Sequence, residues 1–444
     1  MNGWPGKTET SFADKALAFG RDVYSGHGKI EILPKVGAAT LDEMAVAYTP
    51  GVGYVVRHLL DYPENLSLQT TKDNMIALVT DGSAVLGLGN VGPRAGMPVM
   101  EGKAVMFKAL AGIDCMPLSL DVSSPEQFCD VVAALEPTFG GINMEDVAAP
   151  NCFPILRTLE QRLSIPVIHD DQYGTATVAV AALINAVKLT GRRMSDIRVV
   201  VNGVGAAGAA TVSLLGELGV GDIIAVDRVG VLERGVNYPF VHWREIAART
   251  NRENFSGDLA EALKGADAFI GVSVGGLVSE AMVTAMAKDP IVFALANPEP
   301  EISPDRARAA GAAITASGRF DFPNHCNNVL AFPGLMRGAL DTKAKRVTAS
   351  MCLAASRALA SMSGASVDAI LPSPLNATVH AVVAEATALQ AVAEGLARRP
   401  VVEGEVRRRT LDLIASVAER QANLGALTNN AASRRRGAVG SETV

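Results

Sequence analysis

One stretch in the middle of the chain restricts the possible folds most strongly. Residues 196–220, "DIRVVVNGVGAAGAATVSLLGELGV", combine an apolar run, a glycine turn and an apolar segment of helical character. Gly203, Gly205 and Gly208 have the spacing G-x-G-x-x-G, and the next apolar run, "DIIAVD", ends in Asp227. A strand, a glycine turn and a helix, followed by an acid about 20 residues further on, are typical of a dinucleotide-binding unit.

Each position of this turn has a physical reason to be small. The first glycine permits the tight turn, the second lets the backbone approach a pyrophosphate, and the third lets the helix pack on the strand. We therefore predict cofactor contacts along the turn, at Gly203, Gly205, Ala206, Ala207 and Gly208. An ordinary strand–helix turn without a ligand is the alternative, because glycine turns are common.

The kind of dinucleotide stays open. A carboxylate at the position of Asp227 would accept hydrogen bonds from a ribose hydroxyl, which favours NAD. The neighbouring Arg228 could pair with a 2′-phosphate, which favours NADP. The two features oppose each other, so the sequence predicts NAD or NADP.

The rest of the chain continues the alternation of strands and helices, which predicts an α/β fold. From Met75 we expect a strand, a turn at Asp81-Gly82 and a second strand in "VLGLG". A first helix is expected near Ser11–Gly20. Four regions follow from these patterns: a substrate and metal domain at 1–190, a Rossmann-type domain at 191–335, a helical region at 336–427 and a disordered tail at 428–444.

Composition removes several classes of function. The 444 residues carry a net charge of −6 with no basic block in the body of the chain, so we expect neither nucleic acid nor a membrane as partner. The start "MNGWPGKTET" has no apolar core of a signal peptide. Five scattered cysteines without a C-x-x-C pair fit reduced thiols, and a cytoplasmic protein is expected.

Two pairs of adjacent acids follow apolar runs in the first half: Glu145-Asp146 and Asp170-Asp171. Acids at helix starts often only cap the helix, which needs no further function. Like charges this close destabilise each other unless a cation compensates them, and Mg²⁺ or Mn²⁺ prefers such oxygen ligands. From this chemistry alone, a metal site and helix capping remain equal alternatives.

Four other polar residues have two interpretations each. Lys103 lies in an apolar segment, where it could extend to solvent or act as a proton-transfer group. Tyr48 precedes a proline–glycine turn and could simply pack. Asn297 and Asn328 follow apolar strands, where they could form turns or contact a ligand.

Several long motifs resemble the successive motifs of bacterial malic enzymes. They occur in family order: "VAYTPGVG", "VLGLGNVGPRAGMPVMEGKAVMFKALAGID", "ALEPTFGGINMEDVAAPNCFPI", "IPVIHDDQYGTA", "FALANPEPEI" and "FPNHCNNVLAFPG". The resemblance runs from about Ala16 to Pro400. It implies a substrate domain, a Rossmann-type domain and C-terminal helices that return to the first domain. The phosphotransacetylase-like domain that many bacterial relatives carry behind this portion is not expected here.

The resemblance also implies roles for the residues. Glu145, Asp146 and Asp171 would bind Mg²⁺ or Mn²⁺, which stabilises the enolate formed when CO₂ leaves. Lys103 would accept the proton of the C2 hydroxyl of L-malate while a hydride passes to NAD or NADP, and Asp170 would tune or relay that proton. Tyr48 would protonate C3 of enolpyruvate. The remaining roles are contacts with cofactor and substrate at Asn297 and Asn328.

The match has departures and rivals. Tyr173 stands where the family usually has histidine, "PNHCNN" replaces "PNQVNN", and Ala84 replaces an arginine of animal-type enzymes. These affect substrate affinity rather than the proposed chemistry. The rivals are malolactic conversion, oxaloacetate decarboxylation without net redox, a 2-hydroxyacid dehydrogenase that releases no CO₂, and a dinucleotide-sensing subunit. The family also implies a homodimer or a larger homo-oligomer.

Overall fold

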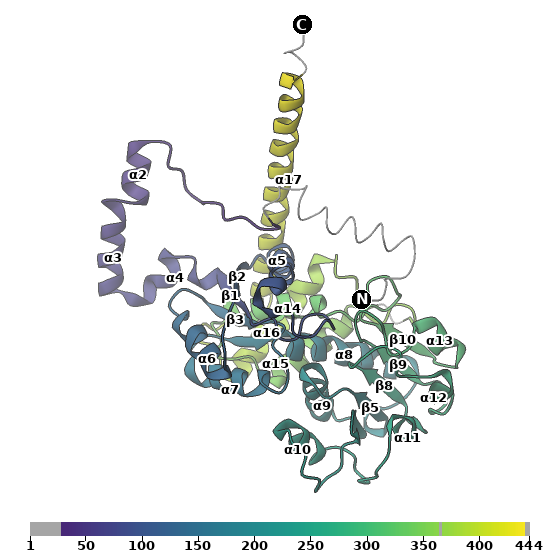
Figure 1. The fold of residues 1–444 in the computed structure, drawn as a ribbon. Coiled ribbons are helices and arrows are strands. Elements are labelled where there is room, and N and C mark those ends of the chain that lie inside the picture. Colours follow the sequence, from purple (N-terminus) through teal and green to yellow (C-terminus); the bar gives the residue numbers. More distant parts are fainter. Residues whose placement is uncertain (1–27, 364–365, 440–444) are drawn as a thin grey trace.

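The computed structural model describes residues 28–363 and 366–439, with side chains up to Asn423. Two sheets, each flanked by helices, lie side by side, and a long helix rises from between them (Figure 1). Within the described residues, no helix is long and apolar enough to cross a membrane. The helix predicted near Ser11–Gly20 lies outside the described residues.

The first sheet is entirely parallel, with the strand order β2-β1-β3-β4. Parallel strands covered on both faces have continuous apolar sequences, as in "MIALVT" of β1, which is buried except for its first residue. The strands are β1 Met75–Thr80, β2 Asp114–Ser119, β3 Gly141–Met144 and β4 Val167–His169. The accompanying helices are α5 Gly92–Ala111, α6 Pro125–Ala134 and α7 Cys152–Arg162.

The second sheet has the order β7-β6-β5-β8-β9-β10, parallel except for β7. Numbered within this sheet, the order is 3-2-1-4-5-6, that of doubly wound dinucleotide-binding folds. Its strands are β5 Arg198–Asn202, β6 Asp222–Asp227, β7 Gly230–Val231, β8 Ala268–Gly271, β9 Ile291–Ala294 and β10 Ile314–Ser317. Its helices are α9 Ala206–Leu218, α10 Val241–Ala247, α11 Leu259–Leu263, α12 Glu280–Thr284 and α13 Pro304–Ala309, with a 3₁₀ turn η3 at Met194–Asp196.

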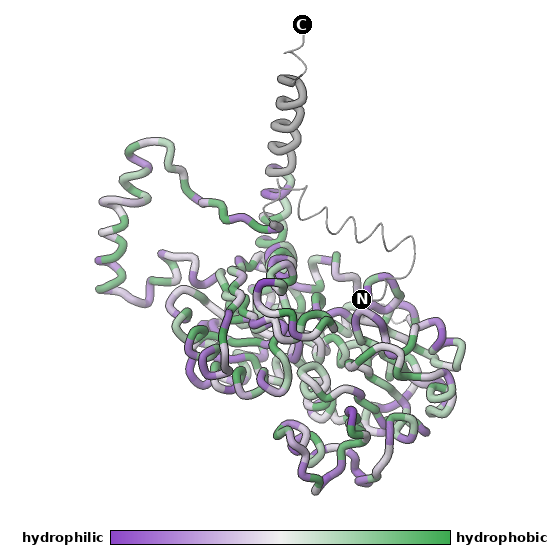
Figure 2. Tube along the Cα trace, viewed as in Figure 1, coloured by the Kyte–Doolittle hydropathy of each residue, from purple (hydrophilic) through white to green (hydrophobic). Residues whose placement is uncertain are grey.

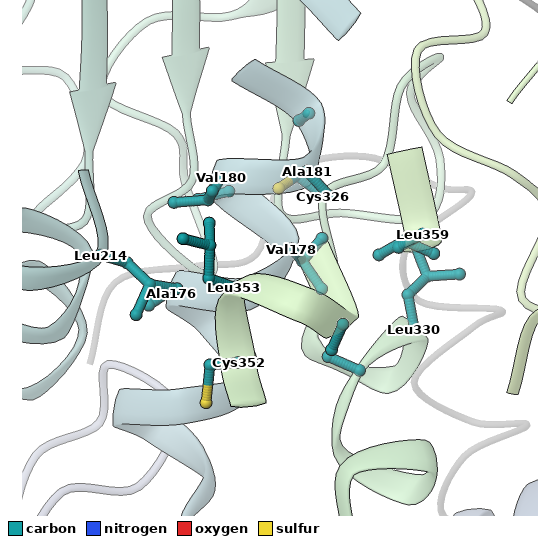
Figure 3. Close-up of a cluster of buried hydrophobic side chains, with 14 of the residues drawn as sticks. Ala176, Val178, Val180, Ala181, Leu214, Cys326, Leu330, Cys352, Leu353 and Leu359 are labelled. Atoms are coloured by element: carbon teal, nitrogen blue, oxygen red, sulfur yellow. The ribbon is translucent and has the colours of Figure 1, made fainter. Parts of the chain in front are cut away.

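Helix α8, Asp170–Leu189, joins the two sheets and is buried along most of its length. Its small residues let α9 and α15, Ala349–Ser361, approach closely: Ala176 lies beside Leu214 and Leu353, and Ala181 lies beside Cys326 (Figure 3). The chain then passes the 3₁₀ turn η4, Asn328–Leu330, into four helices: α14 Phe332–Asp341, α15 Ala349–Ser361, α16 Ala377–Ala393 and α17 Glu405–Val439. Of these, α14, α16 and α17 contact α5 of the first unit, so the helices return to it as expected.

The segment before β1 differs from everything else. Its elements are α2 Leu41–Ala47, α3 Gly51–Asp61, η1 Pro63–Asn65, α4 Leu66–Gln69 and η2 Lys72–Asn74, and none of them buries a residue. In Figure 1, α2 and α3 stand away from the body of the molecule.

One prediction needs correction: the second strand expected in "VLGLG" is only a tight turn closed by an isolated bridge between Val85 and Gly89, because Leu86, Gly87 and Gly89 adopt positive φ angles. The tail expected to be disordered at 428–444 stays a prediction, and helix α17 extends into it as far as Val439. No proline interrupts the segment, and its alanines and arginines favour helix.

Candidate active site

The two acid pairs meet at the carboxyl ends of β3 and β4. Glu145 and Asp146 follow β3, while Asp170 and Asp171 begin α8 directly after β4. The two strands are parallel neighbours with Met144 opposite His169, so their ends bring the acids together. Carboxylate oxygens of Glu145, Asp146 and Asp171 all lie within 4.8 Å of one another.

Helix α5 adds the lysine to this cluster. Lys103 is only 8% exposed, and its Nζ donates to Glu145 Oε1 at 2.7 Å and to the carboxylate of Asp170. The ammonium also lies 4.2 Å from the centre of the Phe332 ring. The alternative of a lysine that extends into solvent is therefore excluded.

The adjacent aspartates face different partners. Asp170 is fully buried and binds Lys103, and its Oδ2 also accepts from Asn328 Nδ2 at 2.6 Å. Asp171 accepts the backbone N–H of Asp146 at 3.0 Å, and one of its oxygens lies 2.9 Å from His169 Nε2. Asp170 therefore contacts the lysine, whereas Asp171 contacts the neighbouring acid pair.

Burial and charge shift the protonation of the whole cluster. Burial raises the pKa of Glu145 and of Asp170, and it raises the pKa of Asp146 to about 7. Burial alone would lower the pKa of Lys103, but Asp170 and Glu145 outweigh it and raise that pKa above its ordinary value. For Asp171, burial alone would raise the pKa, but His169, Lys103 and the backbone N–H of Asp146 together outweigh it and lower the pKa. The cluster holds more negative charge than Lys103 and His169 neutralise.

This arrangement fits a divalent cation. The oxygens of three carboxylates converge, and the buried Asp170 Oδ1 has no hydrogen-bond partner. Asp146 is held at a φ of 54°, a conformation that costs free energy in a residue other than glycine. Hard oxygen donors in excess over local cations are the ligands that Mg²⁺ and Mn²⁺ prefer. Glu145, Asp146 and Asp171 are the residues that would hold such an ion.

The glycine turn fits a dinucleotide. Gly203 has a φ of +92°, and a Cβ at Gly208 would lie 1.9 Å from Gly203 O, so both positions require glycine. A Cβ at Gly205 would meet nothing within 4 Å, which leaves open space beside the turn. Helix α9 begins there without a side-chain cap, so its first N–H groups can receive a phosphate. The turn also lies at the carboxyl end of β5, beside β8, where the strand order reverses, and this is the usual position of the ligand in such sheets.

Asp227 and Arg228 have contacts that the sequence did not reveal. The carboxylate of Asp227 accepts the backbone N–H of Val204 and that of Arg228, each at 2.8 Å, and thereby braces the glycine turn. The guanidinium of Arg228 lies 5.6 Å from the ring centres of Phe240 and Trp243. Asp227 keeps free lone pairs for a ribose, and Arg228 is exposed for a phosphate, so both alternatives persist.

The two asparagines lie at different depths. Asn328 bonds to Asp170 inside the cluster. Asn297 is exposed after β9, where a Cβ on Gly87 would lie 2.3 Å from its carbonyl oxygen. The turn between β1 and α5 therefore touches the loop that follows β9 of the second sheet.

Tyr48 is the predicted residue that does not join the others. It caps α2 at its carboxyl end, is 74% exposed, and lies in the segment that stands away from the body (Figure 1). Tyr173, at the family's histidine position, donates to Glu160 outside the cluster.

Sequence reasoning missed four supporting residues. Phe332 covers the lysine, and Asn143 Nδ2 donates to Glu145 Oε2 at 3.0 Å. His169 lies at ion-pair distance from Asp171 and, when protonated, compensates the charge of that carboxylate. Gly174 leaves room for Asp170, since a Cβ there would lie 1.9 Å from Asp170 Oδ1. The sequence did point to His169 and Gly174, because both belong to the motif that carries the Asp170-Asp171 pair.

Two family models match the chain and divide it near α8. The model for the N-terminal domain of malic enzyme matches residues 27–160. The model for the NAD-binding domain of malic enzyme matches residues 172–393. Together they cover the second sheet, strands β1 to β3 of the first sheet and the first three C-terminal helices. Strand β4 lies between the two matched ranges.

Curated relatives and solved structures agree with these models. A bifunctional malic/malolactic enzyme of Bacillus subtilis is 48% identical over 368 residues, which are 82% of this chain and 90% of that protein. An NAD-dependent malic enzyme of Geobacillus stearothermophilus is 48% identical over 335 residues, 76% of this chain and 70% of the relative. The crystal structure of malic enzyme from Pyrococcus horikoshii matches with a TM-score of 0.89 at 44% identity and covers 93% of this chain and 98% of that one.

Proposed function

The chain belongs to the malic enzyme family, and we propose that the Lys103 cluster carries out the reaction of that family. The reaction is the oxidative decarboxylation of L-malate to pyruvate and CO₂, with reduction of NAD or NADP. The observation that carries the assignment of residues is the contact of buried Lys103 with Glu145 and Asp170, beside three converging carboxylates.

The first step needs a base at the C2 hydroxyl of malate. Lys103 accepts that proton while the hydride on C2 leaves for the nicotinamide, which gives a ketone at C2. Asp170 receives the excess proton from the lysine through their direct bond, and Asn328 holds the Asp170 carboxylate in place. Glu145, Asp146 and Asp171 would hold a divalent ion, whose positive charge would polarise the substrate oxygen and lower the pKa of Lys103 toward that of a base.

The second step breaks the bond between C3 and the C4 carboxylate and releases CO₂. The electron pair of that bond becomes the C2–C3 double bond of an enolate, whose oxygen takes a proton from Lys103 to give the enol. The ketone re-forms when Lys103 takes that proton back while an acid delivers a proton to C3, and Tyr48 is the acid that the family resemblance implies. The buried ring of Phe332 covers one side of the Lys103 ammonium and limits the access of water to it.

One relative supports a second activity at the same site. The Bacillus subtilis protein is named a bifunctional malic/malolactic enzyme. In a malolactic reaction the hydride would return from the reduced cofactor to C2 of pyruvate, and lactate would leave instead of pyruvate. The same residues would serve both reactions, so the products decide between them.

The product balance with purified protein tests the proposal. L-malate, Mn²⁺ and either NAD⁺ or NADP⁺ should yield reduced cofactor and pyruvate in equal amounts, with D-malate as the control substrate. Lactate without free reduced cofactor would establish the malolactic reaction. Oxaloacetate without CO₂ would contradict the proposed decarboxylation, and no reaction by folded protein would favour a dinucleotide-sensing subunit.

The place of this reaction in the cell is also a proposal. All five cysteines are free in the structure, and a small anionic substrate needs no membrane contact. We propose the cytoplasm as the compartment, where thiols stay reduced.

A further inference from the structure

A cavity of about 240 Å³ lies between the two sheet-bearing units, outside the Lys103 cluster. Its walls come from α7 of the first unit, from α8 between the units, and from α9 and α10 of the second unit. Neither acid pair of the Lys103 cluster lines it. The lining side chains include Phe153 and Arg157 of α7, Tyr173 of α8, Ser213 of α9, His242 of α10 and Arg249 just after α10.

The inner walls of this cavity are mostly aromatic or small. The ring centres of Phe153 and His242 lie 4.4 Å apart, a contact that joins α7 to α10. Tyr173, which stands where the family usually has histidine, adds a third ring, while Ala176 and Ala209 leave the space between the helices open. Along α10, hydrophobic and hydrophilic residues are mixed (Figure 2). The walls therefore suit a ligand with an apolar body.

The charged side chains of the cavity are mainly cationic. Arg157 and Arg249 are both exposed, and the guanidinium of Arg157 lies 3.7 Å from Glu245. Arg249 forms no ion pair with any described residue. Burial lowers the pKa of His242, so its ring is uncharged at neutral pH. Two guanidinium groups against one carboxylate favour an anionic group on the ligand, and guanidinium pairs best with a planar carboxylate or with phosphate.

The size of the cavity restricts the ligand further. Sites for drug-sized molecules enclose about 300–1,000 Å³. At about 240 Å³, this cavity suits a smaller molecule, with a single ring or a short branched chain. A phosphate ester of a sugar or nucleoside would place hydroxyl groups against the aromatic walls without partners, so a carboxylic acid fits better than a phosphate.

We propose that this cavity binds a small carboxylic acid with an apolar body, in addition to the substrate and cofactor of the Lys103 site. The carboxylate pairs with Arg249, and the apolar body lies against Phe153 and Tyr173. Binding there requires neither malate nor turnover.

Two contacts link the walls of the cavity to the rest of the molecule. Gln172 also lines the cavity, and its Nε2 lies 2.9 Å from His169 Nδ1, on the ring that faces Asp171. On the other side, His242 lies beside the backbone of Val204 and the carboxylate of Asp227, at the glycine turn. A ligand that fixes His242 should therefore change the affinity for the dinucleotide, because coupling between two binding sites is reciprocal.

Calorimetric titration of the purified protein with sodium benzoate tests the site. At constant ionic strength, the wild type should bind one benzoate per chain with a Kd of about 1 mM or lower. Benzamide, which has the same shape without the charge, should bind at least about tenfold more weakly. No detectable benzoate binding, or equal affinity for benzamide, would overturn the proposal. Loss of benzoate binding in excess L-malate would place benzoate in the substrate site and would also overturn it.

Matched variants locate the bound benzoate. Arg249→Ala should weaken binding at least about tenfold, the effect of one charged hydrogen bond, whereas Arg252→Ala, an exposed arginine outside the cavity, should leave it unchanged. Ser213→Leu should fill the space and abolish binding, and Ser213→Ala should keep the Kd within a few-fold of the wild type. Thermal unfolding verifies that each variant is folded. Wild-type affinity in folded Arg249→Ala or Ser213→Leu would contradict the assigned position.

The fluorescence of bound NADH or NADPH tests the coupling without turnover. Saturating benzoate should change the Kd of the reduced cofactor by about fivefold or more, and this change should vanish in Ser213→Leu. An unchanged Kd in the wild type would contradict the link between the cavity and the glycine turn.

Discussion

Two buried clusters of charged side chains in this molecule look alike but differ in the ratio of acids to cations. In the first, Lys103 faces Glu145 and Asp170, with Asp146 and Asp171 close by. In the second, the fully buried Arg337 of α14 binds Asp341 one turn later and donates to Asn74 Oδ1 at 2.6 Å.

The partners of the two clusters explain the difference. Asp341 also lies 3.2 Å from Arg409 of α17, so the second cluster has cations at least equal to its central carboxylate and ties three parts of the chain together. In the first cluster the acids outnumber the cations, and burial raises the pKa of Glu145, Asp146 and Asp170. A balanced buried pair needs nothing more, whereas an excess of buried carboxylates calls for a metal.

Removal of the lysine should give the largest effect. Lys103→Ala takes away the group that we propose as the base at the C2 hydroxyl, and we expect turnover to fall by about two to four decades. Lys108→Ala is the matched control, because Lys108 lies on the same helix and pairs only with the partly buried Asp114. Steady-state rates with malate check this, and a Lys103→Ala turnover close to wild type would remove the lysine from that role.

Removal of the arginine should affect folding rather than chemistry. Arg337→Ala leaves Asp341 buried with only Arg409 near it, and we expect a loss of about 3 kcal/mol in the free energy of unfolding. The exposed pair of Arg306 and Glu280 gives the comparison, since Arg306→Ala should cost at most about 1 kcal/mol. Urea unfolding measures both, and equal losses would show that burial of the pair is unimportant.

Two glycine-to-alanine substitutions, each of which adds one methyl group to a helix, can separate an effect on turnover from an effect on stability. Gly174→Ala would place a Cβ 1.9 Å from Asp170 Oδ1, and the displaced carboxylate should lose its contact with Lys103. We expect turnover to fall at least about tenfold, the value of one charged hydrogen bond. Gly216→Ala in α9 meets nothing within 4 Å and should instead stabilise the fold by about 0.5–1 kcal/mol. Unchanged turnover in Gly174→Ala would mean that Asp170 needs no fixed position.

The smallest effect should concern the choice of cofactor. Arg228→Ala removes an exposed guanidinium held over Phe240 and Trp243. If this group pairs with a 2′-phosphate, kcat/KM for NADP⁺ should fall about tenfold more than that for NAD⁺, a difference near 1.4 kcal/mol. Equal changes in kcat/KM for both cofactors would show that Arg228 does not distinguish them, and Asp227 alone would remain as the residue that selects the cofactor.

The sequence predicted what depends on local pattern. The buried strands, the glycine turn and the acid pairs at strand ends all follow from neighbouring residues. Contacts between distant elements were beyond it: Lys103 meets Asp170 across 67 positions, and Arg337 meets Asn74 across 263. Neither the spacing nor the composition of a segment encodes such partners. The resemblance supplied a role for Tyr48 but not its exposure, because whether a segment packs on the body depends on contacts with distant residues.

Titration with Mn²⁺ tests most directly whether the excess of acids holds a metal. The account predicts one ion per chain in the wild type. It predicts an affinity at least about tenfold weaker in Asp171→Asn, which loses a ligand. In Asp341→Asn, measured where that variant is folded, the affinity should be unchanged, because the Arg337 cluster needs no ion. A wild type that binds no Mn²⁺, or an Asp171→Asn variant that binds it as tightly, would contradict the account.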